Sequence, residues 1–116
     1  MSENDPYSSA VRRLFADTAH AGRLAGGRSV RLDRQGVRIA LWMTLDGTRI
    51  EALRYQAWGC PHLIAASEAF CRDYEGRPVS ELGGFNAQSL MQSLGIPVEK
   101  TGRILVLEDA VRSLGT

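Results

Sequence analysis

Apolar and polar residues alternate with a period of two through much of the first half of the chain, which is typical of half-buried β-strands. The clearest case runs from Val37 to Leu45, where every second residue is apolar. A shorter alternation over residues 28–33 precedes it. Residues 49–58 follow Asp46-Gly47, a dipeptide that favours a tight hairpin. The pattern predicts a three-stranded antiparallel sheet whose strands follow one another along the chain.

Two features of these strands depart from simple alternation. Ile50 is out of phase with the apolar residues that follow it, which predicts a slip or a bulge. Trp42 and Trp58 fall on the face opposite the main apolar set. We expect helices to pack on that second face rather than a ligand to stack there.

Apolar residues recur at helical spacing in the segments on either side of the strands. Asp5-Pro6 predicts the N-cap and first position of a helix that ends over residues 17–20. Residues 61–75 form a second helical pattern, Asn86 is suited to cap a third helix, and Thr101 a fourth. The order of elements predicts an α+β fold, a three-stranded antiparallel sheet with helices packed mainly on one face, in a single domain over residues 1–116.

Composition and charge exclude several classes of function. The chain is 44% hydrophobic and 23% charged, with a formal net charge of +1, so charge gives no reason to expect a nucleic acid or a membrane as partner. It contains no apolar run near the roughly 20 residues of a membrane span and no signal-peptide segment, so we expect a cytoplasmic protein. A hydrolase triad, a phosphate loop and a zinc motif are all missing from the sequence, so we expect no enzyme.

Cys60 stands where the third strand gives way to a helix. Gly59 breaks the strand, and Pro61 suits the first helical position. Unpaired backbone N–H groups and the positive end of the helix dipole then point at Cys60, which favours the thiolate that attacks sulfur or binds metal. Cys71 lies eleven residues later, about 16 Å further along the helix, too far to share a small metal site. We therefore expect Cys71 to be a core residue.

Several segments in order resemble the iron–sulfur cluster assembly scaffolds of the IscU type, a family that includes the N-terminal domain of NifU. The resemblance rests on Tyr7-Ser8, Trp58-Gly59-Cys60, Ile64-Ala65-Ala66-Ser67, Glu75-Gly76-Arg77-Pro78 and Glu108-Asp109-Ala110, and it covers nearly the whole chain. It implies the family's sandwich fold, iron or an iron–sulfur cluster as the bound group, and a cysteine desulfurase or other assembly proteins as partners.

The chain departs from this family at its cluster site. Scaffolds that it resembles hold the cluster on three cysteines from separate segments, usually with a nearby aspartate. Only the middle cysteine, Cys60, is present. Gln35 stands in place of the first cysteine and Arg103 in place of the third, while Asp33 is close enough in the sequence to reach the site.

His62 follows Cys60 by two residues and suggests a mixed metal site of Cys60, His62 and Asp33. A Cys-x-His fragment is a weak signal by itself. A cation at Arg103 facing the site would stabilise a thiolate but oppose a metal ion. We therefore expect His62 to be an exposed histidine near the start of a helix rather than a ligand.

Three functions remain open from the sequence. The chain is a member of the scaffold family that binds iron or a cluster, alone or with ligands from another chain. Alternatively, Cys60 is the single acceptor of persulfide sulfur from a cysteine desulfurase, chemistry that needs one thiolate. The third possibility is a regulator that binds the partners of true scaffolds and has lost their chemistry.

Overall fold

The computed structural model describes residues 7–116 and contains three strands followed and preceded by helices. In chain order the elements are α1 (Ser9–Ala16), β1 (Arg28–Arg34), β2 (Val37–Asp46), β3 (Arg49–Trp58), α2 (Pro61–Tyr74), the 3₁₀ helix η1 (Val79–Gly84), α3 (Ala87–Leu94), the 3₁₀ helix η2 (Val98–Lys100) and α4 (Thr101–Gly115).

The strands form one antiparallel sheet in the order β1-β2-β3, as the alternation predicts. Leu41 lies opposite Val30 on β1 and Tyr55 on β3, so the apolar residues of all three strands share one face. The register of β2 and β3 shifts between Thr44 and Leu45. This bulge turns Ile50 into the core, and the predicted irregularity is confirmed.

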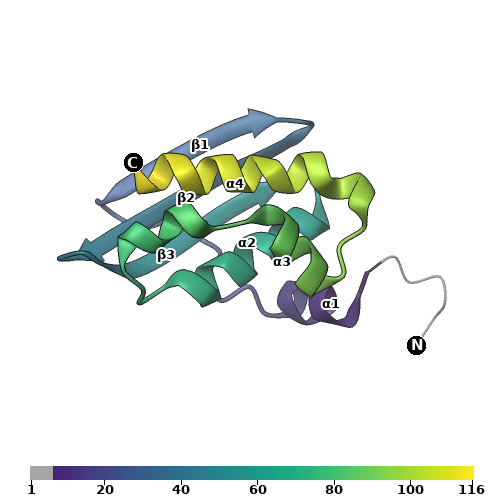
Figure 1. Cartoon of the computed structure of the whole chain (residues 1–116), viewed down its shortest axis with the longest axis horizontal. Helices are drawn as coiled ribbons and strands as arrows, with labels where there is room; N and C mark the ends of the chain where they lie inside the picture. Colours follow the sequence, from purple (N-terminus) through teal and green to yellow (C-terminus); the bar gives the residue numbers. More distant parts are fainter. Residues whose placement is uncertain (1–6) are drawn as a thin grey trace.

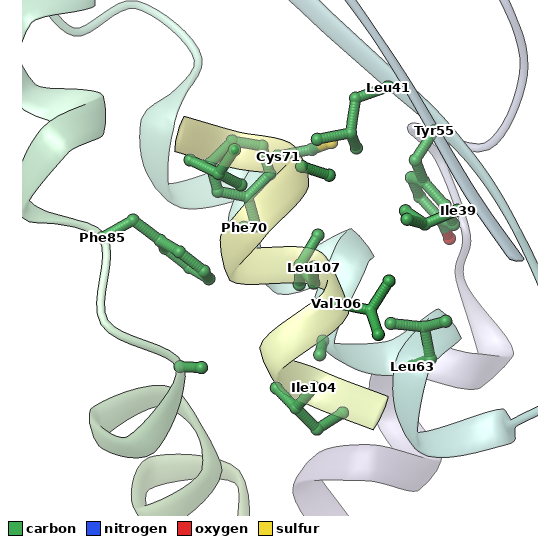
Figure 2. Packing of buried hydrophobic residues seen from close by; sticks show 14 of the residues in the cluster. Ile39, Leu41, Tyr55, Leu63, Phe70, Cys71, Phe85, Ile104, Val106 and Leu107 are labelled. Carbon is green, nitrogen blue, oxygen red and sulfur yellow. The ribbon is translucent and has the colours of Figure 1, made fainter. Parts of the chain in front are cut away.

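The helices α2 and α4 lie side by side over the apolar face of the sheet, with α4 running along β1 and β2 (Figure 1). Figure 2 shows the core between them, where Ile39 and Tyr55 of the sheet face Leu63 of α2 and Val106 of α4. The predicted α+β sandwich with helices mainly on one face is confirmed. Within residues 7–116, the helices are too short or too polar to cross a membrane.

Two of the predicted helix starts were wrong. Helix α1 begins at Ser9, because the Ser8 hydroxyl accepts a hydrogen bond from the Val11 N–H and caps the helix; Asp5-Pro6 lies outside the described residues. Thr101 is the first residue of α4 rather than its cap, because η2 leads directly into that helix. The predicted cap of α3 is confirmed: the Asn86 side chain accepts a hydrogen bond from the Ser89 N–H at 2.8 Å.

The second face of the sheet carries the two tryptophans, and the expectation that helices cover them was wrong. The segment between α1 and β1 crosses this face instead, and the guanidinium of its Arg23 lies 5.8 Å from the Trp42 ring centroid. Trp58 is 44% exposed beneath the guanidinium of Arg38. An antiparallel sheet tolerates such a face, because only one side must be buried.

Candidate functional site

The turn between β1 and β2 packs against the end of β3 through two glycines. A Cβ atom added to Gly59 would lie 2.7 Å from the Gly36 carbonyl oxygen, closer than real Cβ atoms approach. Gly59 also has a φ of 97°, which side chains rarely adopt. The strand therefore ends in a glycine because only glycine lets the backbone pass the turn at that point. This contact sets the position of Cys60, the next residue.

The same turn also reaches the start of α4. Gln35 adopts a φ of 54°, and its side-chain oxygen lies 3.5 Å from the place where a Cβ of Gly102 would stand. Three segments that are far apart in the sequence, residues 35–36, 59–60 and 102–103, thus come together at one end of the sheet. A positive φ is unusual for a residue other than glycine, such as Gln35. Backbone strain of this kind often lies at functional sites.

Cys60 occupies the N-cap position of α2, with Pro61 in the first helical turn. Its side chain makes no capping hydrogen bond, while its carbonyl accepts the bond from the Ile64 N–H. The residue is 2% exposed and packs within the core cluster. The strand–cysteine–helix geometry is therefore the one that the sequence suggests, but the thiol lies beneath the surface rather than on it.

His62 is buried, and the expectation that it is exposed was wrong. It is 3% exposed, because the Tyr7 ring packs over it with 5.0 Å between the ring centroids. Burial lowers the pKa of the imidazole, and the cations of Lys100 and Arg103 lower it further, against an opposing effect of Glu99. His62 Nε2 has no hydrogen-bond partner within residues 7–116. The histidine is therefore held neutral beside the start of α4.

The mixed metal site of Cys60, His62 and Asp33 does not form. Asp33 lies opposite Arg38 in the sheet and makes an ion pair with that guanidinium at 3.2 Å, where its side chain is 65% exposed. Across the described part of the chain, His, Cys, Asp and Glu side chains gather nowhere in a group of three or more that suits a metal ion. The Asp33 side chain therefore contacts its cross-strand arginine rather than Cys60.

Cys71 is fully buried in α2 beside Leu41 and Phe70 (Figure 2), as expected of a core residue. Burial and the carboxylates of Glu68 and Glu75 raise the pKa of its thiol well above the ordinary value. A thiol held protonated in this way is a poor nucleophile. Cys60 is thus the only cysteine at the meeting point of the three segments.

A polar cluster on α2 was not predicted from the sequence. Glu68 is fully buried, and it accepts hydrogen bonds from the His20 backbone N–H at 3.0 Å, the His20 ring at 2.7 Å and the Arg72 guanidinium at 2.9 Å. Glu75 contacts the other ring nitrogen of His20 at 3.3 Å and accepts from the Leu53 N–H and Arg54. The signal in the sequence was His20 itself, which we expected only to end the first helix.

Electrostatics explain how α2 keeps two carboxylates on its sheet side. Burial alone would raise the pKa of the Glu68 carboxyl, but hydrogen bonds from His20 and Arg72 outweigh burial and lower it. The pKa of Glu75 is lowered in the same way by the Leu53 N–H and His20. Both glutamates therefore stay charged in the folded chain, and they anchor the segment after α1 to α2 and β3.

Comparison with protein families decides where this chain belongs. The sequence profile of the NifU-like N-terminal domain matches residues 6–113, nearly the whole chain. This chain belongs to the NifU-like N-terminal domain family. Among curated proteins, none matches it significantly.

Solved structures support the fold of this NifU-like chain. A nitrogen-fixing NifU-like protein (N-terminal) from Brucella abortus aligns with a TM-score of 0.61 and 15% identity over 72% of the chain, which spans 60% of that protein's length. A candidate iron–sulfur cluster assembly scaffold protein for the SUF system, from the thermophile Fervidobacterium islandicum AW-1, aligns with a TM-score of 0.63 and 16% identity over 96% of this chain and 85% of the other. At these identities the likeness establishes the fold.

Proposed function

We propose that this NifU-like chain takes part in iron–sulfur cluster assembly as a one-cysteine sulfur acceptor, with Cys60 as the acceptor residue and a cysteine desulfurase as the sulfur donor. The observation that carries the proposal is the meeting of residues 35–36, 59–60 and 102–103 around a single thiol. The chain has no turnover of its own; it receives sulfur and passes it on.

The donor set at this place does not fit a cluster held by the chain alone. Iron–sulfur clusters are bound chiefly by thiolates, and the positions that match the other two cysteines of the family are Gln35 and Arg103. Cys71 is in the core on a later turn of α2 and is held protonated. The Gln35 amide and the Arg103 guanidinium cannot replace thiolate ligands. The cluster therefore belongs to a later partner in the pathway.

Sulfur acceptance needs one thiolate and no metal. The Cys60 thiolate attacks the outer sulfur of a persulfide on the donor protein, the S–S bond of that persulfide breaks, and the donor cysteine leaves as a thiolate. Cys60 then carries the sulfur as a persulfide. The acceptor stands at the start of α2, where the first backbone N–H groups of the helix have no partner within the helix. No external oxidant or reductant is consumed.

Access to Cys60 requires a small opening, since the residue is 2% exposed. The turn at Gln35 is the element suited to open: it joins two strands by two residues at positive φ, and it contacts both Gly59 and Gly102. Docking of the donor would move this turn rather than the helices of the core. The acceptor is thereby shielded from other oxidants until its donor is bound.

Mass spectrometry tests the proposal directly. The chain is incubated with a cysteine desulfurase and cysteine under anaerobic conditions, and its intact mass is measured. We expect one added sulfur atom on the parent chain and none on Cys60→Ser. An unmodified parent chain would overturn sulfur acceptance.

A second candidate, a partner-binding regulator, is favoured by one surface feature. Val98 in η2 is 80% exposed, an apolar side chain that a partner protein could cover, although the sequence around it, Leu94 to Lys100, keeps only part of the chaperone-binding loop that it resembles. A regulator needs a surface but no thiol. If Cys60→Ser binds and regulates the desulfurase or chaperone as well as the parent chain does, the regulator is the better account.

A further inference from the structure

Strand β1 carries three arginines, and two of them are held by α4. Arg28 donates a hydrogen bond to the Leu114 carbonyl at 3.2 Å, and Arg34 forms an ion pair with Asp109 at 3.1 Å. Arg31 lies between them and is exposed on the opposite face of the strand, because side chains alternate along β1. Within residues 7–116 its guanidinium makes neither an ion pair nor a hydrogen bond. Arg31 is thus a free cation on the second face of the sheet.

A second guanidinium without a carboxylate partner lies on the same face. Arg23 belongs to the segment between α1 and β1, and its guanidinium stands 5.8 Å from the centroid of the Trp42 ring. It makes no ion pair with any residue that the structure describes. The end of this segment is held against the sheet, because a Cβ atom at Gly27 would collide with the Met43 carbonyl. The position of Arg23 is therefore set by the backbone and by Trp42 rather than by a carboxylate.

Both guanidiniums line the same pocket. It has a volume of about 420 Å³, within the range of small-molecule sites. The residues that line it together with Arg23 and Arg31 are Leu24, Ser29, Val30, Ala40 and Trp42. No carboxylate is among these described lining residues, and the exposed Ser29 hydroxyl makes no hydrogen bond within residues 7–116. The pocket thus combines two free cations and a free hydroxyl with apolar side chains.

Other arginines of the strands show that free cations are not the rule on this face. Arg38 of β2 forms an ion pair with Asp33 at 3.2 Å, and Arg54 of β3, which lies opposite Trp42, forms one with Glu75 at 3.1 Å. The chain therefore supplies carboxylates to its neighbouring guanidiniums but supplies none to this pocket. Two unneutralised charges in one pocket favour an anion from outside the chain.

The donors of the pocket indicate which anion fits. A carboxylate has two oxygens, and a single guanidinium already satisfies both in a bidentate pair. A phosphate monoester has three terminal oxygens and close to two negative charges at neutral pH, so it matches two guanidiniums and a hydroxyl. Leu24 and Trp42 then offer an apolar wall to the organic part of the ester. Arginine is also the residue best suited to such planar, bidentate recognition of phosphate.

We propose that this pocket binds the phosphate group of a phosphate monoester, with Arg23, Arg31 and Ser29 as donors and the organic part of the ester against Trp42. A free metabolite and a phosphorylated side chain of a partner protein present the same group. The bound phosphate joins the segment before β1 to β1 itself, so binding stabilises the folded chain. The site does not involve Cys60, and it holds or fails separately from sulfur acceptance.

An NMR titration tests the site. The ¹⁵N-labelled chain is titrated at constant ionic strength with phenyl phosphate, inorganic phosphate and benzoate. We expect phenyl phosphate to shift the Arg31 amide and the Trp42 indole N–H, and to bind at least tenfold more tightly than benzoate and more tightly than inorganic phosphate. Equal affinity for benzoate or for inorganic phosphate would overturn the proposal, as would shifts confined to residues outside 23–31 and 40–42.

Two further titrations identify the source of the phosphate. A peptide with a central phosphoserine and its unphosphorylated form are added in parallel with phenyl phosphate. Tighter binding of the phosphopeptide than of phenyl phosphate supports the site with a partner protein as the source, and weaker binding supports it with a free metabolite. Equal binding of both peptide forms, with no shift from phenyl phosphate, would overturn the site. Cys60→Ser should bind every probe as the parent chain does.

Substitutions that remove the same charge locate the binding. Arg31→Gln and Arg23→Gln each remove one guanidinium from the pocket, and each should weaken the binding of phenyl phosphate about tenfold or more. The control Arg13→Gln removes an exposed arginine of α1 that makes no ion pair within residues 7–116, and it should bind like the parent. Because Arg31 has no partner to lose, Arg31→Gln should keep the urea midpoint of the parent. Equal weakening by all three substitutions would mean general attraction of an anion and would overturn the site.

Discussion

At the scale of single residues, Gly59 determines how close the turn at Gln35-Gly36 comes to Cys60. We predict that Gly59→Ala destabilises the chain by about 2 kcal/mol or more, because the new Cβ would lie 2.7 Å from a backbone oxygen and the residue holds a φ of 97°. Gly84→Ala is the matched control, since that glycine faces open space and has no unusual φ. Urea unfolding measures both variants, and equal midpoints would contradict the close approach.

His62 gives the second prediction, on pH. Its pKa is lowered below 6.5 in the folded chain by burial and by nearby cations. The unfolded chain therefore binds a proton at higher pH than the folded chain, so this contribution to stability is complete above pH 6.5 and is lost as the pH falls below that value. His62→Phe should remove this part of the pH dependence. The free energy of unfolding of both proteins is measured in urea between about pH 5 and 7.5. Parallel curves of this free energy against pH would contradict the prediction.

The residue scale also shows what the sequence could reveal about the site. Cys60 was identifiable because glycine before it and proline after it mark a strand-to-helix junction. The burial of His62 was not, since it depends on the Tyr7 ring, which comes from a distant part of the chain. Asp33 was assigned to the site by its distance along the sequence, but cross-strand pairing with Arg38 decided its position.

At the scale of elements, the link between residues 17–22 and α2 depends on the buried carboxylate of Glu68. We predict that Glu68→Gln costs about 3 kcal/mol, because it leaves His20 and Arg72 without their charged acceptor. Glu81→Gln is the control, since that glutamate makes a largely exposed ion pair with Arg77 at 3.5 Å, worth under about 1 kcal/mol. Denaturant unfolding measures the loss of stability in both variants.

Amide exchange adds an element-specific readout to the same variants. If Glu68 anchors residues 17–22, the Gly22 and Tyr55 amides, which pair across that bridge, should lose protection in Glu68→Gln before the rest of β3 does. Uniform loss of protection along β3 would mean that Glu68 stabilises the fold in general and not this segment.

The elements themselves were predictable to different degrees. The strands could be predicted, because an alternation with a period of two on both sides of Asp46-Gly47 fits few structures other than a β-hairpin. The start of α1 was not, because a serine cap at Ser8 competed with the Asp5-Pro6 signal. The path of residues 17–27 was also not predictable: it is held by ion pairs to α2 and by Arg23 over Trp42, neither of which leaves a periodic pattern.

At the scale of the whole molecule, the fold brings together three segments that carry one thiol among them. We predict that anaerobic reconstitution of the isolated chain with iron and sulfide yields no stable cluster, since Gln35 and Arg103 supply no thiolate. Absorption spectroscopy and iron analysis of the desalted protein give the result. A coloured product with stoichiometric iron, lost in Cys60→Ser, would show that the chain is a scaffold after all.

The most direct measurement of the central claim follows a labelled sulfur atom to its residue. The desulfurase is supplied with cysteine that carries an isotopic sulfur label, the chain is alkylated and digested, and the peptides that contain Cys60 and Cys71 are analysed by mass spectrometry. We predict labelled persulfide on the Cys60 peptide and an unlabelled Cys71 peptide. Label on Cys71, or on neither peptide, would contradict the assignment of Cys60 as the sulfur acceptor.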